Sequence, residues 1–469
     1  MEKSSNTSFD YDLICIGSGP AGQRAAVQAA KLGKKAAVIE KRRMVGGACL
    51  DTGTIPSKTF REAVLAFSHL KNNFHEHGRG ASGRPTASQL LSGVQEVIRT
   101  EGDVLEDQLF RNDVAMIKGD ASFQDPHTLQ LVTEGDTTRI RAENILVAVG
   151  TIPTPPPGVP ADGKIVINSD GVLSLTDLPR TMAVVGAGVI GLEYASMFGD
   201  LGIEVTVVDG RQRPLEFLDS EIVDELIHQM RNKNVLFRLN ETVESLEISS
   251  GPRTRAVLNL ESGKRLVSDL VLYSVGRLGA TEALNLKAAG LEADSRGRLT
   301  VNDHFQTTVP HIYAAGDVIG YPSLAATSSE QGRLAACYAF NIPTEPMVDH
   351  FPIGIYSIPE ISMVGKTEQD LTREKIPYES GIARYKEIAR GGIMGDDSGF
   401  LKMLFHRQDR RLLGVHAIGT GATELIHVGQ AVLGMGGGLD YFIKTVFNYP
   451  TLAECYKVAA LDAYNKLHE

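Results

Sequence analysis

Runs of apolar residues near the start of the chain predict a strand, a helix and a second strand. Residues 11–16 (YDLICI) are mostly apolar and stop at Gly17, which is typical of a short buried strand. Residues 20–32 carry apolar side chains at helical spacing, and residues 34–40 return to a strand pattern. The same order recurs at 182–185, 189–199 and 203–209. Two such strand–helix–strand units predict parallel, doubly wound sheets.

The pattern changes between these two units and after them. Short stretches rich in β-forming residues occupy 114–117, 129–132 and 145–149. A proline-rich segment follows at 153–160. Because proline fixes φ and lacks an N–H, this segment predicts the first domain boundary. We place further candidate boundaries near Gly276-Arg277 and at 341–349.

The C-terminal part of the chain mixes strands with helices. Strand patterns occur at 401–405 and 412–418, and helix patterns at 422–433 and 452–467. Glycines 436–438 predict a loop after a helix end. We therefore predict an α/β protein with two Rossmann-like dinucleotide-binding domains and a C-terminal α+β domain.

Composition and charge narrow the class of protein. The 469 residues leave room for about three domains. The 47 basic and 57 acidic side chains give a formal net charge of −10, which argues against a non-specific nucleic-acid partner. No apolar run reaches the roughly 18 residues of a membrane helix, and Met1–Asp10 lacks the apolar core of a secretory signal. The 4 cysteines form no metal-like pair, so we expect a cytoplasmic protein without membrane contact or metal.

Two glycine motifs carry the clearest chemical signal. The first G-x-G-x-x-G motif and the acid that ends its unit are Gly17, Gly19, Gly22 and Glu40. The second set is Gly186, Gly188, Gly191 and Asp209, and in both copies the acid follows the first glycine by 23 residues. Such glycines form the turn, admit a pyrophosphate and let helix and strand pack closely, while the acid binds a ribose. The chain is therefore expected to bind a flavin and a nicotinamide nucleotide.

Further segments resemble one enzyme family along essentially the whole chain. They are residues 46–58 (GGACLDTGTIPSK), 148–150, 274–277, Thr307 with 315–317, and 358–360 with 364–368. In this order they are similar to the flavin-dependent pyridine nucleotide–disulfide oxidoreductases. The resemblance implies an FAD domain at 1–155 and 277–347, an NAD(P) domain at 156–276 and a dimerisation domain at 348–469. A homodimer or larger homo-oligomer is therefore expected.

The resemblance also implies roles for individual residues. Asp317 would hold the flavin ribityl chain, and Lys58 would lie near flavin N5, paired with Glu193. The helix that begins at Ala325 would direct its positive end at the N1/O2 edge of the flavin, where reduced flavin carries negative charge. The remaining residues implied in nucleotide binding are Gly47, Cys49, Gly150, Gly276 and Gly316.

Two departures from the family pattern exclude disulfide reduction. Cys49 is present, but Thr54 stands where the second thiol is expected, and Tyr449 replaces the catalytic His before Pro450-Thr451. Disulfide exchange needs two thiols and an acid/base to protonate the leaving thiolate. Both replacements, together with the sequences of residues 320–325 and 447–451, make the chain similar to the family members that exchange hydride between NADPH and NAD⁺. The expected reaction is NADPH + NAD⁺ to NADP⁺ + NADH through FAD, with NAD(H) and NADP(H) as substrates that use one site in turn.

Several interpretations stay open at this point. Asp209 would repel the 2′-phosphate of NADP(H), and Arg211 and Arg213 would bind that phosphate. The alternative is that both arginines are solvated surface charges. Cys49 is either a redox sensor or, as we favour, a thiol that only packs. Tyr449 either forms a hydrogen bond near the flavin or fills the space that the catalytic His occupies in the family. Alternative functions are an NAD(P)H diaphorase that reduces a quinone, and a nucleotide-binding redox sensor with little turnover.

Overall fold

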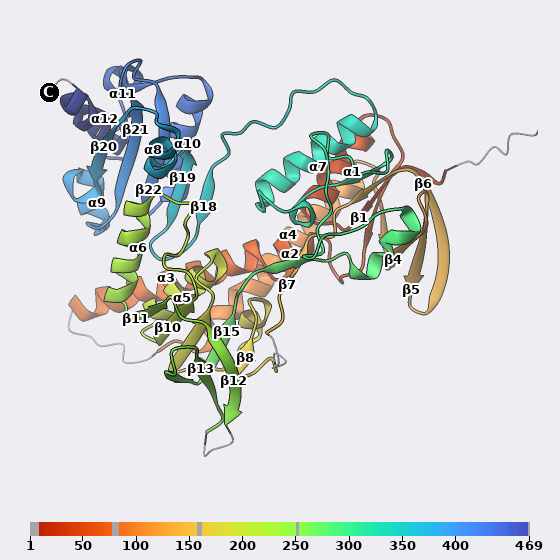
Figure 1. Ribbon diagram of the computed structural model, residues 1–469, viewed down its shortest axis with the longest axis horizontal. Helices are drawn as coiled ribbons and strands as arrows, with labels where there is room; N and C mark the ends of the chain where they lie inside the picture. Colours follow the sequence, from red (N-terminus) through yellow and green to blue (C-terminus); the bar gives the residue numbers. More distant parts are fainter. Residues whose placement is uncertain (1–8, 77–83, 157–161, 250–252, 468–469) are drawn as a thin grey trace, which may run out of the picture.

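The computed structural model describes residues 9–76, 84–156, 162–249 and 253–467. Three main sheets organise these residues, and Figure 1 shows the C-terminal sheet in blue, away from the sheet that contains β1. Residues 157–160 of the proline-rich segment lie outside the described residues. The same holds for the first 8 of residues 1–10.

The first sheet is built around the first predicted unit. Its strand order is β3-β2-β1-β6-β5-β4, with β17 paired to β6. The strands are β1 (Tyr11–Ile16), β2 (Ala36–Glu40), β3 (Ala115–Lys118), β4 (Asp120–Asp125), β5 (Thr128–Thr133), β6 (Asp136–Val147) and β17 (Ile312–Ala314). Strands β3, β2, β1, β6 and β17 pair in parallel, and β4 and β5 extend β6 as an antiparallel ribbon. Helices α1 (Pro20–Lys31) and α7 (Ala325–Ala339) pack against each other beside this sheet.

The second sheet repeats the arrangement on a smaller scale. Its order is β11-β10-β9-β15-β8, all parallel. The strands are β8 (Val166–Ile167), β9 (Thr181–Val185), β10 (Glu204–Asp209), β11 (Val235–Leu239) and β15 (Leu270–Tyr273), with helices α5 (Val189–Asp200) and α6 (Ser220–Asn232). A separate antiparallel sheet joins β12 (Val243–Ser249), β13 (Arg255–Leu260) and β14 (Arg265–Ser268). Strands β7 (Thr151–Pro153) and β16 (Arg277–Gly279) pair where the chain crosses between the first two units.

The C-terminal sheet is antiparallel along the pairs β18-β19-β22-β21-β20. Its strands are β18 (Ile353–Ile355), β19 (Ile361–Gly365), β20 (Tyr378–Arg384), β21 (Phe400–His406) and β22 (Leu412–Ile418). The helices are α8 (Glu368–Glu374), α9 (Ala389–Met394), α10 (Ala422–Gly434), α11 (Leu439–Lys444) and α12 (Glu454–Leu467). The predicted helix at 452–467 therefore begins two residues later, at Glu454. Glycines 436–438 lie between α10 and α11, as predicted.

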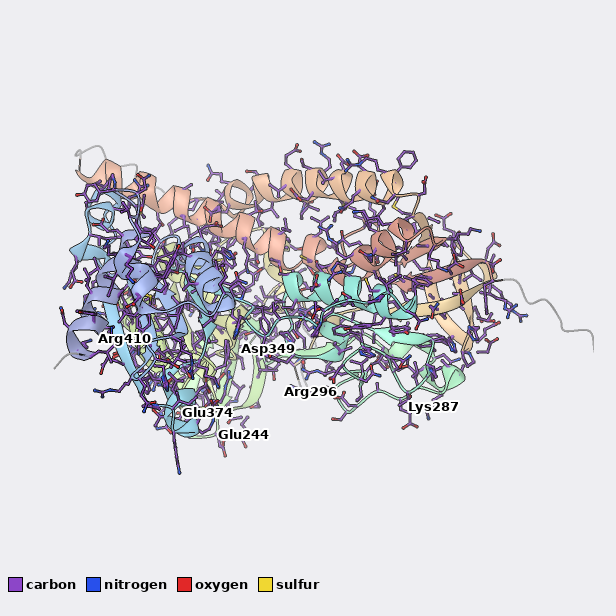
Figure 2. The ribbon with its side chains drawn as sticks, turned by 90° about the horizontal axis from the view of Figure 1, so that it is seen from above. Glu244, Lys287, Arg296, Asp349, Glu374 and Arg410 are labelled. Carbon is purple, nitrogen blue, oxygen red and sulfur yellow. The ribbon has the colours of Figure 1, made fainter. Side chains whose placement is uncertain are left out.

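Two long helices connect the units. After α2 (Gly47–Asp51) come α3 (Thr54–Glu76) and α4 (Ala87–Arg111), and Figure 2 shows both along one side of the molecule. Helix α3 contacts the C-terminal unit through Arg61, which donates to Ser357 O at 3.1 Å and pairs with Glu360 at 3.0 Å. No helix was predicted in this stretch, although α4 has a buried stripe at helical spacing, formed by Leu90, Val94, Ile98 and Leu109.

The structure confirms the predicted fold class. The β-α-β units lie within one or two residues of their predicted bounds, and the C-terminal part is α+β. The domain bounds at 155, 276 and 347 stay a prediction. In the described ranges no helix is long and apolar enough to cross a membrane. Among the same residues no group of three or more His, Cys, Asp or Glu is arranged to hold a metal ion.

Candidate active site

The first glycine loop joins β1 to α1 with almost no room inside it. A Cβ on Gly22 would lie 1.9 Å from Gly17 O, and one on Gly17 would lie 2.4 Å from Ala148 O. A Cβ on Gly19, by contrast, would meet nothing within 4 Å. The loop is therefore closed against the sheet at its first and third glycines and open at its second, as a pyrophosphate site requires.

Glu40 and the redox segment meet this loop. Glu40 accepts hydrogen bonds from Ser18 N at 3.0 Å and Ser18 Oγ at 2.5 Å. The same hydroxyl accepts a bond from Gly46 N at 2.9 Å. Gly47, at φ +60°, lies so close that a Cβ would be 2.9 Å from Gly19 Cα. The structure thus brings the first motif, its acid and the segment that contains Cys49 into one site.

The second glycine loop has the same construction. Cβ atoms on Gly191 and Gly186 would lie 2.0 Å from Gly186 O and 2.5 Å from Ser274 O, whereas one on Gly188 would meet nothing within 4 Å. A cavity of about 600 Å³ opens from this loop. Its lining includes Gly186, Gly188, Asp209, Gly210, Arg211, Glu241, Thr242, Tyr273, Gly276 and Arg277. The cavity is large enough for much of a nucleotide.

The two predicted phosphate-binding arginines differ in their contacts. Arg211 forms an ion pair with Asp209, with Nη2 at 2.7 Å from Oδ2. Burial opposes ionisation of Asp209, but the hydrogen bonds from Arg211 and Ala187 offset it and hold the pKa below its ordinary value. Arg213 instead donates to Ser220 O at 3.0 Å and pairs with Asp224 on α6. Of these two arginines, Arg211 lines the cavity and Arg213 does not.

Lys58 and Glu193 are joined by an ion pair between α3 and α5. Lys58 Nζ lies 3.0 and 2.8 Å from the two carboxylate oxygens of Glu193, whose side chain is only 6% exposed. The C-terminal unit completes the group, because Tyr356 N donates to Glu193 at 2.8 Å and the Tyr356 ring lies 5.0 Å from Lys58 Nζ. Three units therefore fix one ammonium group. The sequence analysis missed Tyr356, although it stands two residues before the Ile358-Pro359-Glu360 motif.

Asp317 is a half-buried carboxylate with few donors among the described residues. It follows Gly316 at the start of a short 3₁₀ helix, Asp317–Ile319. Burial raises its pKa, and the positive charge of Arg277 and a hydrogen bond from Thr151 offset part of that rise. The Thr151 hydroxyl is 3.4 Å away, a weak contact. A carboxylate placed in this way has capacity to accept hydrogen bonds from a polyhydroxyl chain, so the site fits the implied flavin.

Cys49 on α2 lies beside Thr54, the first residue of α3. Burial raises the pKa of the Cys49 thiol, and a hydrogen bond with Thr54 opposes that rise. A cavity of about 250 Å³ beside them is lined by Cys49, Leu50, Ile55 and Ala325 among others. Helix α7 begins at Ala325 without a side-chain cap, so its first N–H groups are free to face a negative group.

One predicted residue is not brought to this group within one chain. Tyr449 is 68% exposed and lies between α11 and α12, which Figure 1 shows at the outer end of the C-terminal unit. Glu454 Oε2 is buried and accepts no hydrogen bond from any described residue. Gly150 follows β6, at φ +64°, and its carbonyl accepts a hydrogen bond from Ala280 N.

Comparisons with known proteins agree with this geometry. The family model described as pyridine nucleotide-disulphide oxidoreductase matches residues 11–332, and the dimerisation domain of the same family matches residues 351–460. A Mycobacterium tuberculosis protein named soluble pyridine nucleotide transhydrogenase is 51% identical over 461 residues, covering 98% of each chain. An Escherichia coli protein of the same name is 44% identical, over 98% of this chain and 99% of that protein.

The fold has a close solved counterpart. The HOCl-induced flavoprotein disulfide reductase RclA from Escherichia coli superposes with a TM-score of 0.86 at 26% identity, covering 96% of this chain and 99% of that chain. The match extends over all three units. The chain therefore belongs to the pyridine nucleotide-disulphide oxidoreductase family.

Proposed function

We propose that the protein is a flavin-dependent transhydrogenase that converts NADPH and NAD⁺ to NADP⁺ and NADH. One observation carries the proposal. Two dinucleotide loops of the same construction flank a site with a single thiol, Cys49, and with Thr54 beside it. Hydride exchange needs no second thiol, whereas disulfide reduction does. The relatives named soluble pyridine nucleotide transhydrogenase, similar over nearly the whole chain, support this activity.

The first glycine loop, Glu40 and Asp317 would hold FAD, which when bound supplies the group that accepts and returns hydride. The second loop and its cavity would hold the adenosine and pyrophosphate of either nicotinamide nucleotide. Lys58 keeps one positive charge in a fixed place, because it pairs with Glu193, the Tyr356 main chain holds that carboxylate, and the Tyr356 ring lies beside the ammonium. That charge, with the free amides of α7, would stabilise the negative charge that hydride transfer creates.

One nicotinamide site has to serve both substrates in turn. Since NADPH and NAD⁺ cannot occupy it together, the kinetics should be ping-pong. The test mixes the FAD-loaded protein with NADPH and thio-NAD⁺, a spectrally distinct acceptor, with no other oxidant present. Sustained transfer with parallel initial-rate lines is expected. Intersecting lines would contradict a shared site, turnover only after a quinone is added would favour the diaphorase, and no turnover in either case would favour the sensor.

We also propose a homodimer formed through the C-terminal unit. The match to the family's dimerisation domain supports it. So do apolar side chains that one chain leaves exposed there: Met435, Val446 and Tyr449. Light scattering should give twice the mass of one chain. All four cysteines are free, which supports our proposal of a reducing, cytoplasmic location.

A further inference from the structure

The carboxylate of Asp209 is fully engaged by the chain itself. Oδ1 accepts from the main-chain N of Arg211 at 2.8 Å and from its Nε at 2.9 Å. Oδ2 accepts from Ala187 N at 2.6 Å and from Arg211 Nη2 at 2.7 Å. A carboxylate offers about four acceptor positions, and all four are taken. A ribose hydroxyl therefore binds this acid only if one of the four donors leaves.

The guanidinium of Arg211 is the donor that can leave. Ala187 N belongs to the buried glycine loop, and the main chain of Arg211 is held by Asn240 N, which donates to its carbonyl at 3.1 Å. The Arg211 side chain, by contrast, is 47% exposed. Asp209 keeps its two main-chain donors when the solvated guanidinium leaves, so the Arg211 side chain can be exchanged at modest cost.

The first unit provides an internal comparison. Arg42 follows Glu40 by two residues, as Arg211 follows Asp209, and its main-chain N donates to Glu40 at 2.7 Å in the same way. The side chain of Arg42 turns away, however, and pairs with Asp51. In the described part of the chain, Glu40 therefore forms no ion pair with a guanidinium. The arginine covers the acid only in the unit that has to exchange two different nucleotides.

We propose, on the basis of the function proposed above, that Arg211 and Asp209 are a selector pair through which one site reads both adenosine ends. The ribose 2′-hydroxyl of NAD(H) takes the place of the guanidinium on Asp209. The 2′-phosphate of NADP(H) displaces the Arg211 guanidinium from Asp209, and the guanidinium then binds the phosphate. Each nucleotide breaks the same ion pair and uses the opposite partner, so neither is strongly preferred. Arg213, bound to Ser220 and Asp224, takes no part in this exchange.

This arrangement differs from two independent contacts in one measurable respect. If Arg211 only added a phosphate contact, its removal would weaken binding of a 2′-phosphate and would not strengthen binding of a free ribose. If it also covers Asp209, its removal strengthens ribose binding. The two readings therefore give opposite signs for a ligand without the 2′-phosphate.

The test uses the FAD-loaded protein and two matched probes, 5′-AMP and 2′,5′-ADP, which differ only in the 2′-phosphate. Titration calorimetry on R211A should show 5′-AMP bound about twofold to fivefold more tightly and 2′,5′-ADP about tenfold more weakly. D209N should bind 2′,5′-ADP more tightly and 5′-AMP more weakly. R213A removes a positive charge from the same loop without uncovering Asp209, so it should not tighten 5′-AMP.

Unchanged or weaker 5′-AMP binding in R211A, relative to R213A, would overturn the selector pair. The same conclusion would follow if D209N failed to tighten 2′,5′-ADP. Failure of the proposed function is recognised separately, because it would appear in the wild-type protein as a flavin that neither NADPH nor NADH reduces. Binding of the two probes does not depend on that reaction.

Discussion

At the scale of single residues, the Lys58–Glu193 pair is the group whose charge matters most to hydride transfer. Replacing Lys58 by Met removes the fixed positive charge and leaves Glu193 buried without its cation. We expect the rate of flavin reduction by NADPH to fall about 10²-fold or more. Anaerobic stopped-flow absorbance measures this rate directly.

The matched control for this substitution is Ser57→Ala. Ser57 Oγ lies 3.3 Å from Lys58 Nζ, so the change removes a neighbouring contact and keeps the ion pair. The same hydroxyl donates to Thr54 O at 3.2 Å, and neither of these two long hydrogen bonds carries the ion pair, so the reduction rate should stay within about threefold of wild type. A Lys58→Met protein that retains FAD and reduces it at the wild-type rate would contradict the role of the charge.

The thiol of Cys49 gives a prediction about pH. Because burial raises its pKa, the reactive thiolate is scarcer at neutral pH than in an ordinary thiol, and its fraction rises as pH increases. Iodoacetamide should therefore label Cys49 more slowly than glutathione at pH 7.5, with a rate that climbs into the alkaline range. The Thr54→Val variant loses the hydrogen bond that lowers the pKa, so its labelling should be slower still.

Peptide mapping identifies the labelled residue, and the other three cysteines are buried. Labelling of Cys49 that is faster than labelling of glutathione at pH 7.5 would favour the redox-sensor interpretation over a packed thiol.

The sequence alone left these two interpretations open, because the environment of a thiol depends on residues far away along the chain. Here those residues include Asp317, whose charge also raises the pKa of Cys49.

At the scale of elements, the second glycine of each loop permits a test that leaves the fold intact. Gly19 and Gly188 have extended backbones, with φ of −62° and −79°, and a Cβ on either meets nothing within 4 Å. Alanine should therefore fold normally at both positions and obstruct only the approaching pyrophosphate. We expect Gly19→Ala to lose FAD, and Gly188→Ala to keep FAD but bind NADPH at least about tenfold more weakly.

Each of these variants is the control for the other. The flavin content after purification reports on the first loop, and calorimetric titration with NADP⁺ reports on the second. Thermal unfolding should stay near that of the wild-type protein in the second variant. If Gly188→Ala lost FAD, or Gly19→Ala lost only NADP⁺ binding, the assignment of the two loops would be wrong.

The same scale shows what the sequence pattern can and cannot predict. Both β-α-β units are predictable because the apolar run, the glycine turn and the terminal acid lie close together in the sequence and all indicate the same local structure. Helix α4 has an equally clear sequence signal that was not used for prediction. It is a capping box from Thr86 to Gln89, followed by apolar residues at every fourth position. The contact of Tyr356 with Lys58 has no local signal, because it joins residues almost 300 positions apart.

At the scale of the whole molecule, Lys402 joins the C-terminal unit to the unit built around the second sheet. Its side chain is fully buried on β21, and Nζ lies 3.0 Å from Asp219, 2.7 Å from Glu221 and 3.3 Å from Glu368. Asp219 is also the N-cap of α6. No pattern in the sequence predicts this cluster, because a lysine in an apolar strand gives no indication of which distant carboxylates surround it.

Replacing Lys402 by Met should lower the stability of the protein by about 3–5 kcal/mol, since Asp219 stays buried without its cation. The control is Glu221→Gln, because the Glu221 side chain is 53% exposed and its loss should cost no more than about 1 kcal/mol. Urea unfolding of the FAD-loaded protein measures both. Equal stability of the two variants would show that the ion pair between Lys402 and Asp219 contributes little.

The pH dependence of the same cluster follows from Asp219. Burial raises the pKa of this carboxyl, but His416 and Lys402 more than offset it, so the folded pKa lies below the ordinary value of 3.8. A depressed folded pKa means that the stabilisation is complete above pH 3.8 and is lost as the pH falls through the folded pKa. In Lys402→Met the carboxyl loses that support and its pKa rises. The gap between the folded pKa and the ordinary value of 3.8 therefore narrows or reverses, so the stability lost through this carboxyl on acidification should be smaller than in wild type. An equal or larger loss in unfolding curves between about pH 5 and 2 would contradict it.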